Sequence, residues 1–262
     1  MLAPTHVQVA QQRHSYALLP PGAGAVSRRD WRVHQIPGDK GGAQHRMREA
    51  DRPARQPLQQ VVGEQIEVLG EVLRDEVNLA IWQRRLPAAI GAFASALLAR
   101  GEPLADSRVL ELAHSESPVA LGDLLQGYGE LPGQAAFIAD VGWLVSAFAC
   151  LVDATRIGLR LRILDKAMCP RFHVDHVPLR LITCYAGVGS QWLREGVMAR
   201  GSLGDPSAEP QDDALIELSA AGHVLLAKGE KWLGNEGGGL IHRSPQPPTD
   251  ERRLLLTLDW LA

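Results

Sequence analysis

The spacing of hydrophobic residues divides the chain into a helical part and an extended part. From about residue 57, apolar residues such as Ile66, Leu69 and Leu73 recur every three or four positions, which is the spacing of one helix face. Beyond residue 154 the spacing falls to two, the period of a strand with one buried face. The pattern therefore predicts a helical region over 57–154 and a β-rich region over 155–262.

Turn and cap residues set the expected limits of the helices. After a first helix from about residue 57, residues 78–85 read as a connection, and Pro87 opens a second helix that Gly101 ends. A shorter helix is expected over 119–127 and a longer one over 134–153. The longest helix contains Asp140 on its helical period, so we expect a buried core helix and not a membrane span.

Five extended runs are expected after the last helix. They cover residues 157–164, 173–185, 220–226, 240–243 and 253–261. A segment rich in Gly, Asp, Pro and Ser separates the second run from the third and reads as a loop. Helices followed by at least five strands predict an α+β domain, in which N-terminal helices brace a sheet that curls into a barrel. The whole of 57–262 is expected to be one compact domain.

Composition and charge narrow the class of protein. The 262 residues are 45% hydrophobic and 22% charged with a net charge of −3, which is typical of a soluble globular protein and argues against a general nucleic-acid binder. Residues 1–55 carry nine Lys and Arg against four acids. Because this stretch also holds several Pro and Gly and no sustained period, residues 1–56 are predicted to be an irregular or disordered basic leader.

Cysteine content and the start of the chain bear on location. Three cysteines are too few and too scattered for a disulfide framework, which favours a reducing compartment. Polar residues interrupt the first apolar stretch, so we expect no secretory signal and no membrane segment. The prediction is a cytoplasmic protein.

Two histidines and one aspartate in the β-rich region suggest a metal centre. His173 and Asp175 are two residues apart, so on a strand they point to the same face, and His242 follows His173 by 69 positions in another apolar run. Two imidazoles and a carboxylate form the facial triad that binds non-haem Fe(II) and leaves coordination positions open. Mn(II) and Zn(II) are alternative metals for the same residues.

The last predicted strand supplies an anion-binding group. Arg252 and Arg253 follow His242 by ten and eleven residues, and a guanidinium there can pair with the carboxylate of a 2-oxo acid. Alternation places Arg253 and Thr257 on the more polar strand face and Arg252 on the more apolar one. Arg253 is therefore the expected co-substrate ligand, with Thr257 as a further donor and Arg252 as the second choice.

These residues in this order resemble the Fe(II)/2-oxoglutarate dioxygenase superfamily. The resemblance implies a double-stranded β-helix, also called a jelly-roll or cupin-like barrel, with His173, Asp175 and His242 as metal ligands. It also implies 2-oxoglutarate as co-substrate and hydroxylation or demethylation of a small molecule or a protein side chain. One departure is His223, which stands where the superfamily often has Asp.

A closer resemblance is to an uncharacterised bacterial family known as a domain of unknown function. Similar blocks are CPRFHVD at 169–175, KGEKW at 228–232, HRSP at 242–245 and RLLLTLD at 253–259. This resemblance spans roughly residues 60–262. It implies no activity, so the predicted chemistry still depends on the triad.

Two other interpretations remain open. Cys169 and Cys184 with His173 and His176 offer thiolates and imidazoles to zinc, although C-x3-H-x2-H is not a usual structural-zinc spacing. The alternative function is therefore a cupin-like metal-binding protein, of the zinc-handling kind, without turnover. The leading hypothesis is a non-haem iron, 2-oxoglutarate-dependent dioxygenase.

Overall fold

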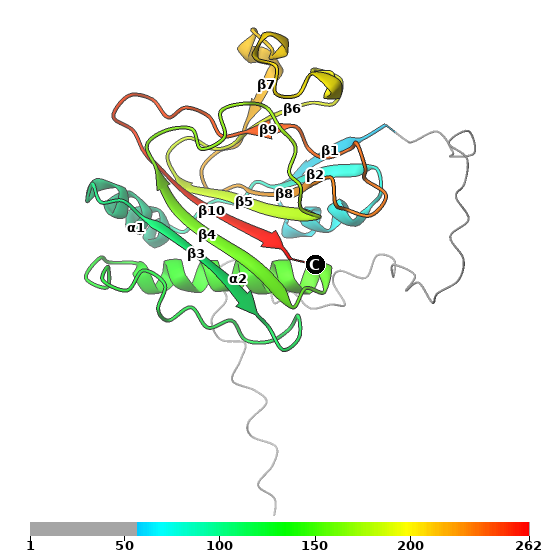
Figure 1. Cartoon of the computed structure of the whole chain (residues 1–262). Helices are drawn as coiled ribbons and strands as arrows, with labels where there is room; N and C mark the ends of the chain where they lie inside the picture. The colour runs from blue at the N-terminus through cyan, green and yellow to red at the C-terminus, as the bar shows by residue number, and fades with distance from the viewer. Residues whose placement is uncertain (1–56, 262) are drawn as a thin grey trace, which may run out of the picture.

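A computed structural model describes residues 57–261, which form a mixed α/β structure built around one large sheet (Figure 1). In spatial order the large sheet contains β1 (Gln59–Gly63), β2 (Val77–Trp82), β8 (Val224–Lys228), β5 (Leu179–Ala186), β10 (Arg253–Trp260), β4 (Arg156–Leu164) and β3 (Ala105–Glu111). A small sheet contains β7 (Ile216–Leu218), β6 (Gln191–Leu193) and β9 (His242–Arg243). The helices are α1 (Ala88–Ala99), α2 (Gln134–Val152) and the 3-10 segments η2 (Ile66–Leu73), η3 (Arg200–Ser202), η4 (Pro206–Ala208) and η5 (Asp213–Leu215).

Strand β10 is the centre of the large sheet because it pairs with β4 on one side and β5 on the other, antiparallel to both. Its Thr257 lies opposite Arg160 of β4 and Ile182 of β5. Only β1 and β2 pair in parallel among the described strands. This register places alternate residues of three adjacent strands on a common face, so it decides which side chains can share a site.

The two faces of the large sheet pack against different partners. Leu254, Leu256 and Leu258 of β10 belong to the main core that the sheet shares with α1 and α2. The intervening Leu255 belongs to a second cluster with Trp192 of the small sheet. Both faces of β10 are therefore covered, which explains its nearly continuous apolar sequence. Figure 1 shows α1 and α2 on one side of the large sheet and the small sheet on the other.

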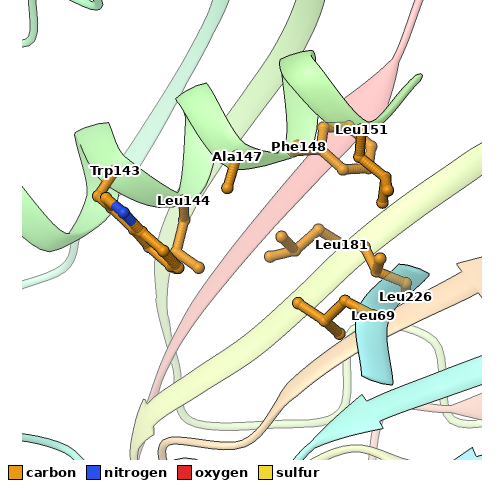
Figure 2. A pocket seen from close by; sticks show the side chains of 8 residues that line it. All are labelled: Leu69, Trp143, Leu144, Ala147, Phe148, Leu151, Leu181 and Leu226. Atoms are coloured by element: carbon orange, nitrogen blue, oxygen red, sulfur yellow. The ribbon is translucent and has the colours of Figure 1, made fainter. Parts of the chain in front are cut away.

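Helix α2 packs across the sheet through an apolar interface. Figure 2 shows Leu181 of β5 and Leu226 of β8 facing Leu144 and Phe148 of α2 around a small gap with hydrophobic lining. Although α2 is the one described helix that is long and apolar enough to cross a membrane, half of its most apolar window is buried inside the protein. The gap has no polar lining side chain to support chemistry, so it is a feature of core packing.

A charged network is buried where α2 meets the sheet. Arg84 makes two hydrogen bonds to Asp140, with Nη1–Oδ1 at 2.7 Å and Nη2–Oδ2 at 2.9 Å. The hydroxyl of Tyr185 on β5 donates to Oδ2 of Asp140 at 2.6 Å. The carboxylate that marked α2 in the sequence is therefore fully buried and paired, and it joins the helix to β5.

The expectation that 57–154 is mainly helical is wrong. Strands β1, β2 and β3 lie in this interval, and residues 122–127, expected to be helical, form turns. Segment η2 is a 3-10 helix, in which apolar residues also recur every three positions, so its pattern resembles that of an α-helix. Strand β2 is buried on both faces and lacks alternation.

The remaining elements lie close to their expected positions. Helices α1 and α2 and strands β4, β8, β9 and β10 overlap the predicted runs. The run expected over 173–185 is shorter, since only its second half is β5 and His173 makes an isolated bridge. The domain bounds at 56/57 and 154/155, and the prediction that 57–262 is one compact domain, stay predictions. The leader, residues 1–56, lies outside the described residues.

Candidate metal centre

His173, Asp175 and His242 lie together between the two sheets. His173 and His242 are bridge partners whose backbones exchange two hydrogen bonds, each with an N–O distance of 3.0 Å. One ligand atom from each of the three side chains lies within 4.8 Å of the others. Nε2 of His242 is 3.3 Å from Oδ2 of Asp175, and Nε2 of His173 is 3.8 Å from Oδ1. Three side chains from two distant segments therefore converge as the spacing predicted.

The two imidazoles present their Nε2 atoms to the centre. Nδ1 of His173 is 2.9 Å from the carbonyl oxygen of Arg171, and Nδ1 of His242 is 3.1 Å from that of Leu240. A carbonyl oxygen only accepts, so each Nδ1 must donate and each neutral ring keeps its lone pair on Nε2. Burial lowers the pKa of His173, which favours the neutral form that binds metals.

The two oxygens of Asp175 have different surroundings. Oδ1 accepts a hydrogen bond from Nη1 of Arg180 at 2.6 Å. Oδ2 is buried and accepts no hydrogen bond, although it faces His242. Burial opposes ionisation of this carboxyl, but His242 and Arg180 outweigh that effect and lower the pKa of Asp175 below its usual range. An ionised, buried oxygen without a hydrogen-bond donor is suited to bind a cation.

The donor set favours Fe(II) or Mn(II) over a thiolate-bound zinc. Two imidazole nitrogens and one carboxylate oxygen on one side form the facial arrangement that these metals take with open positions. Among residues 57–261 this is the one group of three or more His, Cys, Asp or Glu side chains placed to hold an ion. Cys169, His176 and Cys184 do not belong to it, so the structure does not bring together the zinc set that the sequence allowed.

Asp259 is linked to Asp175 through Arg180, which contacts both carboxylates. Arg180 donates from Nε to Oδ1 of Asp259 at 2.5 Å and from Nη2 to Oδ2 at 3.1 Å, and Arg160 of β4 also pairs with this carboxylate. Asp259 is almost fully buried. Arg180 is thus fixed between two carboxylates, which restricts the direction from which it can contact Asp175.

The KGEKW block supports both segments that carry ligands. The backbone N–H of Glu230 donates to the carbonyl of Asp175 at 2.9 Å. Its carboxylate accepts from the backbone of Gly237 at 2.7 Å and of Gly239 at 3.0 Å, in the turn that leads to His242. A Cβ on Gly229 would lie 2.6 Å from the same Asp175 carbonyl, so this close approach requires glycine. The block therefore positions the two segments that carry Asp175 and His242.

Glu209 joins the neighbours of the two histidines. Its carboxylate accepts from the backbone N–H of Phe172 at 3.3 Å and from Nη1 of Arg243 at 2.8 Å. Phe172 precedes His173 and Arg243 follows His242. The segment that contains η3, η4 and η5 is thus fastened next to the metal centre by one buried carboxylate.

Arg253 is buried on the same side of the large sheet as the second cluster. Its side chain is fully buried. Nη1 contacts Ser244 Oγ at 3.4 Å, Nη2 contacts Ser190 Oγ at 3.2 Å, and the thiol of Cys184 also interacts with the guanidinium. Nε has no hydrogen-bond partner. Ser244 follows His242 by two residues, so this guanidinium borders the segment that carries the metal ligand. Burial lowers the pKa of Arg253.

Thr257 and Arg252 fall on opposite sides of β10. Thr257 is buried on the Arg253 face. Arg252 instead donates from Nη2 to the carbonyl oxygen of Leu98 at 2.8 Å, at the C-terminal end of α1. The structure therefore brings Arg253 and Thr257 to one face, as the alternation predicted, and does not bring Arg252 there.

Sequence reasoning did not identify Arg180, Glu209 or Glu230 as parts of the site. Arg180 and Ile182 are two residues apart on β5 and therefore share a face. This spacing could have indicated which face Arg180 occupies. Asp259 lies two residues beyond Thr257, on the same face of β10 as Arg253. Glu209 carried no such signal because it lies in an irregular segment.

Comparison with known proteins gives a family without a described activity. The family described as "Protein of unknown function (DUF1826)" matches residues 63–259. No curated protein matches the sequence.

Among solved structures, the chain has a distant similarity to several oxygenases. A dioxygenase for auxin oxidation from rice is 12% identical with a TM-score of 0.41, over 78% of this chain and 83% of that one. A prolyl-4-hydroxylase from Pseudomonas putida is 12% identical with a TM-score of 0.39, over 74% and 96%. An oxidoreductase of the 2OG-Fe(II) oxygenase family from Burkholderia pseudomallei is 10% identical with a TM-score of 0.35, over 77% and 94%.

Proposed function

The chain belongs to the DUF1826 family of proteins of unknown function, and from the geometry of its site we propose that it is an Fe(II)- and 2-oxoglutarate-dependent oxygenase. The large and small sheets that face each other would be the two halves of a double-stranded β-helix. His173, Asp175 and His242 would hold the metal, and Arg253 would bind the co-substrate. The substrate would be a small molecule or a protein side chain that is hydroxylated or demethylated.

One observation carries the proposal: a fully buried guanidinium lies without a carboxylate partner beside the segment of a metal ligand. A buried cation is costly unless an anion pairs with it. Arg253 has an unpaired Nε and only two serine hydroxyls and the Cys184 thiol as neighbours, whereas the terminal nitrogens of Arg84 and Arg180 bind carboxylates. A dicarboxylate that reaches the metal would satisfy this guanidinium.

The chain's own residues would prepare the centre for such a reaction. With its three protein ligands on one side, the bound Fe(II) would supply the oxidising chemistry together with the keto acid and O2. Arg180 holds one oxygen of Asp175 and leaves Oδ2 for the metal. The carbonyls of Arg171 and Leu240 fix the imidazole tautomers. Arg253 and Thr257 would orient the distal carboxylate of the co-substrate.

Anaerobic titration of the Fe(II)-loaded protein with 2-oxoglutarate tests the proposal. The enzyme should develop a weak visible charge-transfer band as the keto acid chelates the iron, and with O2 it should convert 2-oxoglutarate to succinate. Arg253→Gln should weaken 2-oxoglutarate binding by about ten- to a hundredfold, since a charged hydrogen-bond partner contributes roughly 1.5–3 kcal/mol. Arg252→Gln is the matched control and should bind normally.

Equal binding by both arginine variants would remove the co-substrate from the proposal. If the protein bound metal tightly but gave neither the band nor succinate, it would be a metal-binding barrel without turnover.

A further inference from the structure

Two arginines of β4 lie on the same face of the large sheet as the candidate metal centre. Arg160 and Arg162 alternate with Leu159 and Leu161, which are buried in the main core with the helices. The arginines therefore project to the opposite face. Leu164, next in this alternation, packs against the second cluster between the sheets. The sequence pattern predicted a half-buried strand, and the polar side of that strand faces the site.

Positive charge exceeds negative charge on this face. By alternation, strands β4, β5 and β10 place five guanidinium groups there, those of Arg156, Arg160, Arg162, Arg180 and Arg253. The facing carboxylates are Glu111, which pairs with Arg156, Asp259, which pairs with Arg160 and Arg180, and Asp175, which pairs with Arg180. If 2-oxoglutarate occupies Arg253, one guanidinium of this group still lacks an anion, and the metal adds further positive charge.

That guanidinium belongs to Arg162. Its Nη2 is 3.4 Å from Ser107 Oγ and its Nη1 is 3.5 Å from Met168 Sδ, both weak contacts. Its Nε is buried without a hydrogen-bond partner, and the described residues give it no carboxylate. The side chain as a whole is only half-buried, so a ligand can reach it.

Arg162 also borders the proposed co-substrate site. The backbone N–H of Met168, whose sulfur contacts Arg162, lies 3.4 Å from Ser244 Oγ. The same hydroxyl contacts Arg253 at 3.4 Å. A ligand on Arg162 would therefore lie beside, but not on, the guanidinium reserved for 2-oxoglutarate.

We propose that the substrate oxidised at this centre is an organic oxyanion, a carboxylate or a phosphate monoester, and that Arg162 is its specificity-determining ligand with Arg160 beside it. This inference rests on the proposed function. A guanidinium offers a planar fork that matches both oxyanions and keeps its charge at every physiological pH. Arg180 does not serve because its donors already bind two carboxylates.

Paramagnetic relaxation by Mn(II) tests the inference without turnover. Protein loaded with Mn(II) and saturated with 2-oxoglutarate is mixed with benzoate, phenyl phosphate or neutral benzamide, and proton relaxation of each probe is measured. The protons of benzoate or of phenyl phosphate should relax faster than those of benzamide, because a bound anion lies near the ion. The anion with the larger relaxation enhancement identifies the preferred oxyanion. Arg162→Gln should weaken the binding of that probe by about tenfold or more, and Arg162→Lys should restore part of it. Arg156→Gln, an exposed arginine on the same strand, should have no effect.

The outcomes separate this inference from the proposed function. If benzamide relaxes as fast as the anions, or Arg162→Gln binds them normally with an unchanged melting temperature, the inference is overturned. If Arg162→Gln unfolds, two other measurements replace it: probe binding by Arg160→Gln and displacement of the probe by inorganic phosphate. Normal binding by Arg160→Gln together with no displacement by phosphate overturns the inference. If 2-oxoglutarate itself fails to bind while the anionic probes still depend on Arg162, the proposed function fails and the anion site stands.

Discussion

Nη1 of Arg180 donates to Oδ1 of Asp175 at 2.6 Å, and this contact directs the other carboxylate oxygen toward His242. Arg180 is itself held by Asp259 through two hydrogen bonds. A side chain that touches no metal thus determines which oxygen of Asp175 is available to one.

Arg180→Gln should lower Mn(II) affinity by about ten- to a hundredfold, the usual loss when an outer partner of a metal ligand is removed. Isothermal titration calorimetry on the metal-free protein measures it. Arg194→Gln is the control, because Arg194 pairs with Glu217 at the surface and should leave the affinity unchanged. Normal affinity in Arg180→Gln, with the fold intact, would show that Asp175 needs no such support.

Arg84→Met should destabilise the protein strongly. The substitution leaves the carboxylate of Asp140 fully buried without its cation, and breaking a buried pair in this way costs about 3–5 kcal/mol. Urea unfolding measures the free energy. The neighbouring Arg85 is exposed, so Arg85→Met should change that free energy by no more than about 0.5 kcal/mol. Similar values for both variants would contradict a structural role of the buried pair.

Glu230→Ala should loosen the turn that leads to His242. The carboxylate accepts hydrogen bonds from Gly237 and Gly239, and their loss should lower the free energy of unfolding by about 1–2 kcal/mol. Amide hydrogen exchange should accelerate at those two glycines, and Mn(II) affinity should fall. Lys231→Ala, at the exposed next position, is the control. Unchanged exchange at both glycines would rule out this role.

Metal binding should raise the melting temperature, since an ion that binds only the folded protein stabilises it. At a hundred times its Kd, Mn(II) should add about 2.7 kcal/mol, which corresponds to roughly 5–10 °C for a domain of this size. Differential scanning calorimetry with and without chelator measures the shift. His242→Ala should abolish it, whereas His176→Ala should retain it because His176 is exposed and outside the cluster. The same shift in both variants would place the metal elsewhere.

The shared face of His173 and Asp175 could be predicted from sequence because it depends on local alternation. His173 and Asp175 are two residues apart, and this spacing alone puts both side chains on one face of an extended segment. The same rule predicted that Arg253 and Arg252 lie on opposite faces of the strand, as they do. What alternation does not supply is pairing between distant strands, and the contact of Arg180 with Asp259 depends on the register of β5 and β10.

The fold of residues 57–154 could be predicted only in part. Helices α1 and α2 have long apolar periods and were identified, whereas β1, β2 and β3 were not. Strand β2 is covered on both faces, so it has no period to read. Strand β3 is an edge strand whose alternate residues are exposed, and its charged residues hide the extended pattern. These strands take their structure from neighbours that are distant in sequence.

The reciprocal backbone hydrogen bonds of His173 and His242 have a consequence for the speed of metal binding. These bonds form when the protein folds, so two of the three ligands are already held at a fixed separation when the ion arrives. Little conformational entropy is then left to lose on coordination. Metal capture should therefore be limited by the exchange of water around the incoming ion and not by the closing of a loop, and release should be slow without requiring that the protein open.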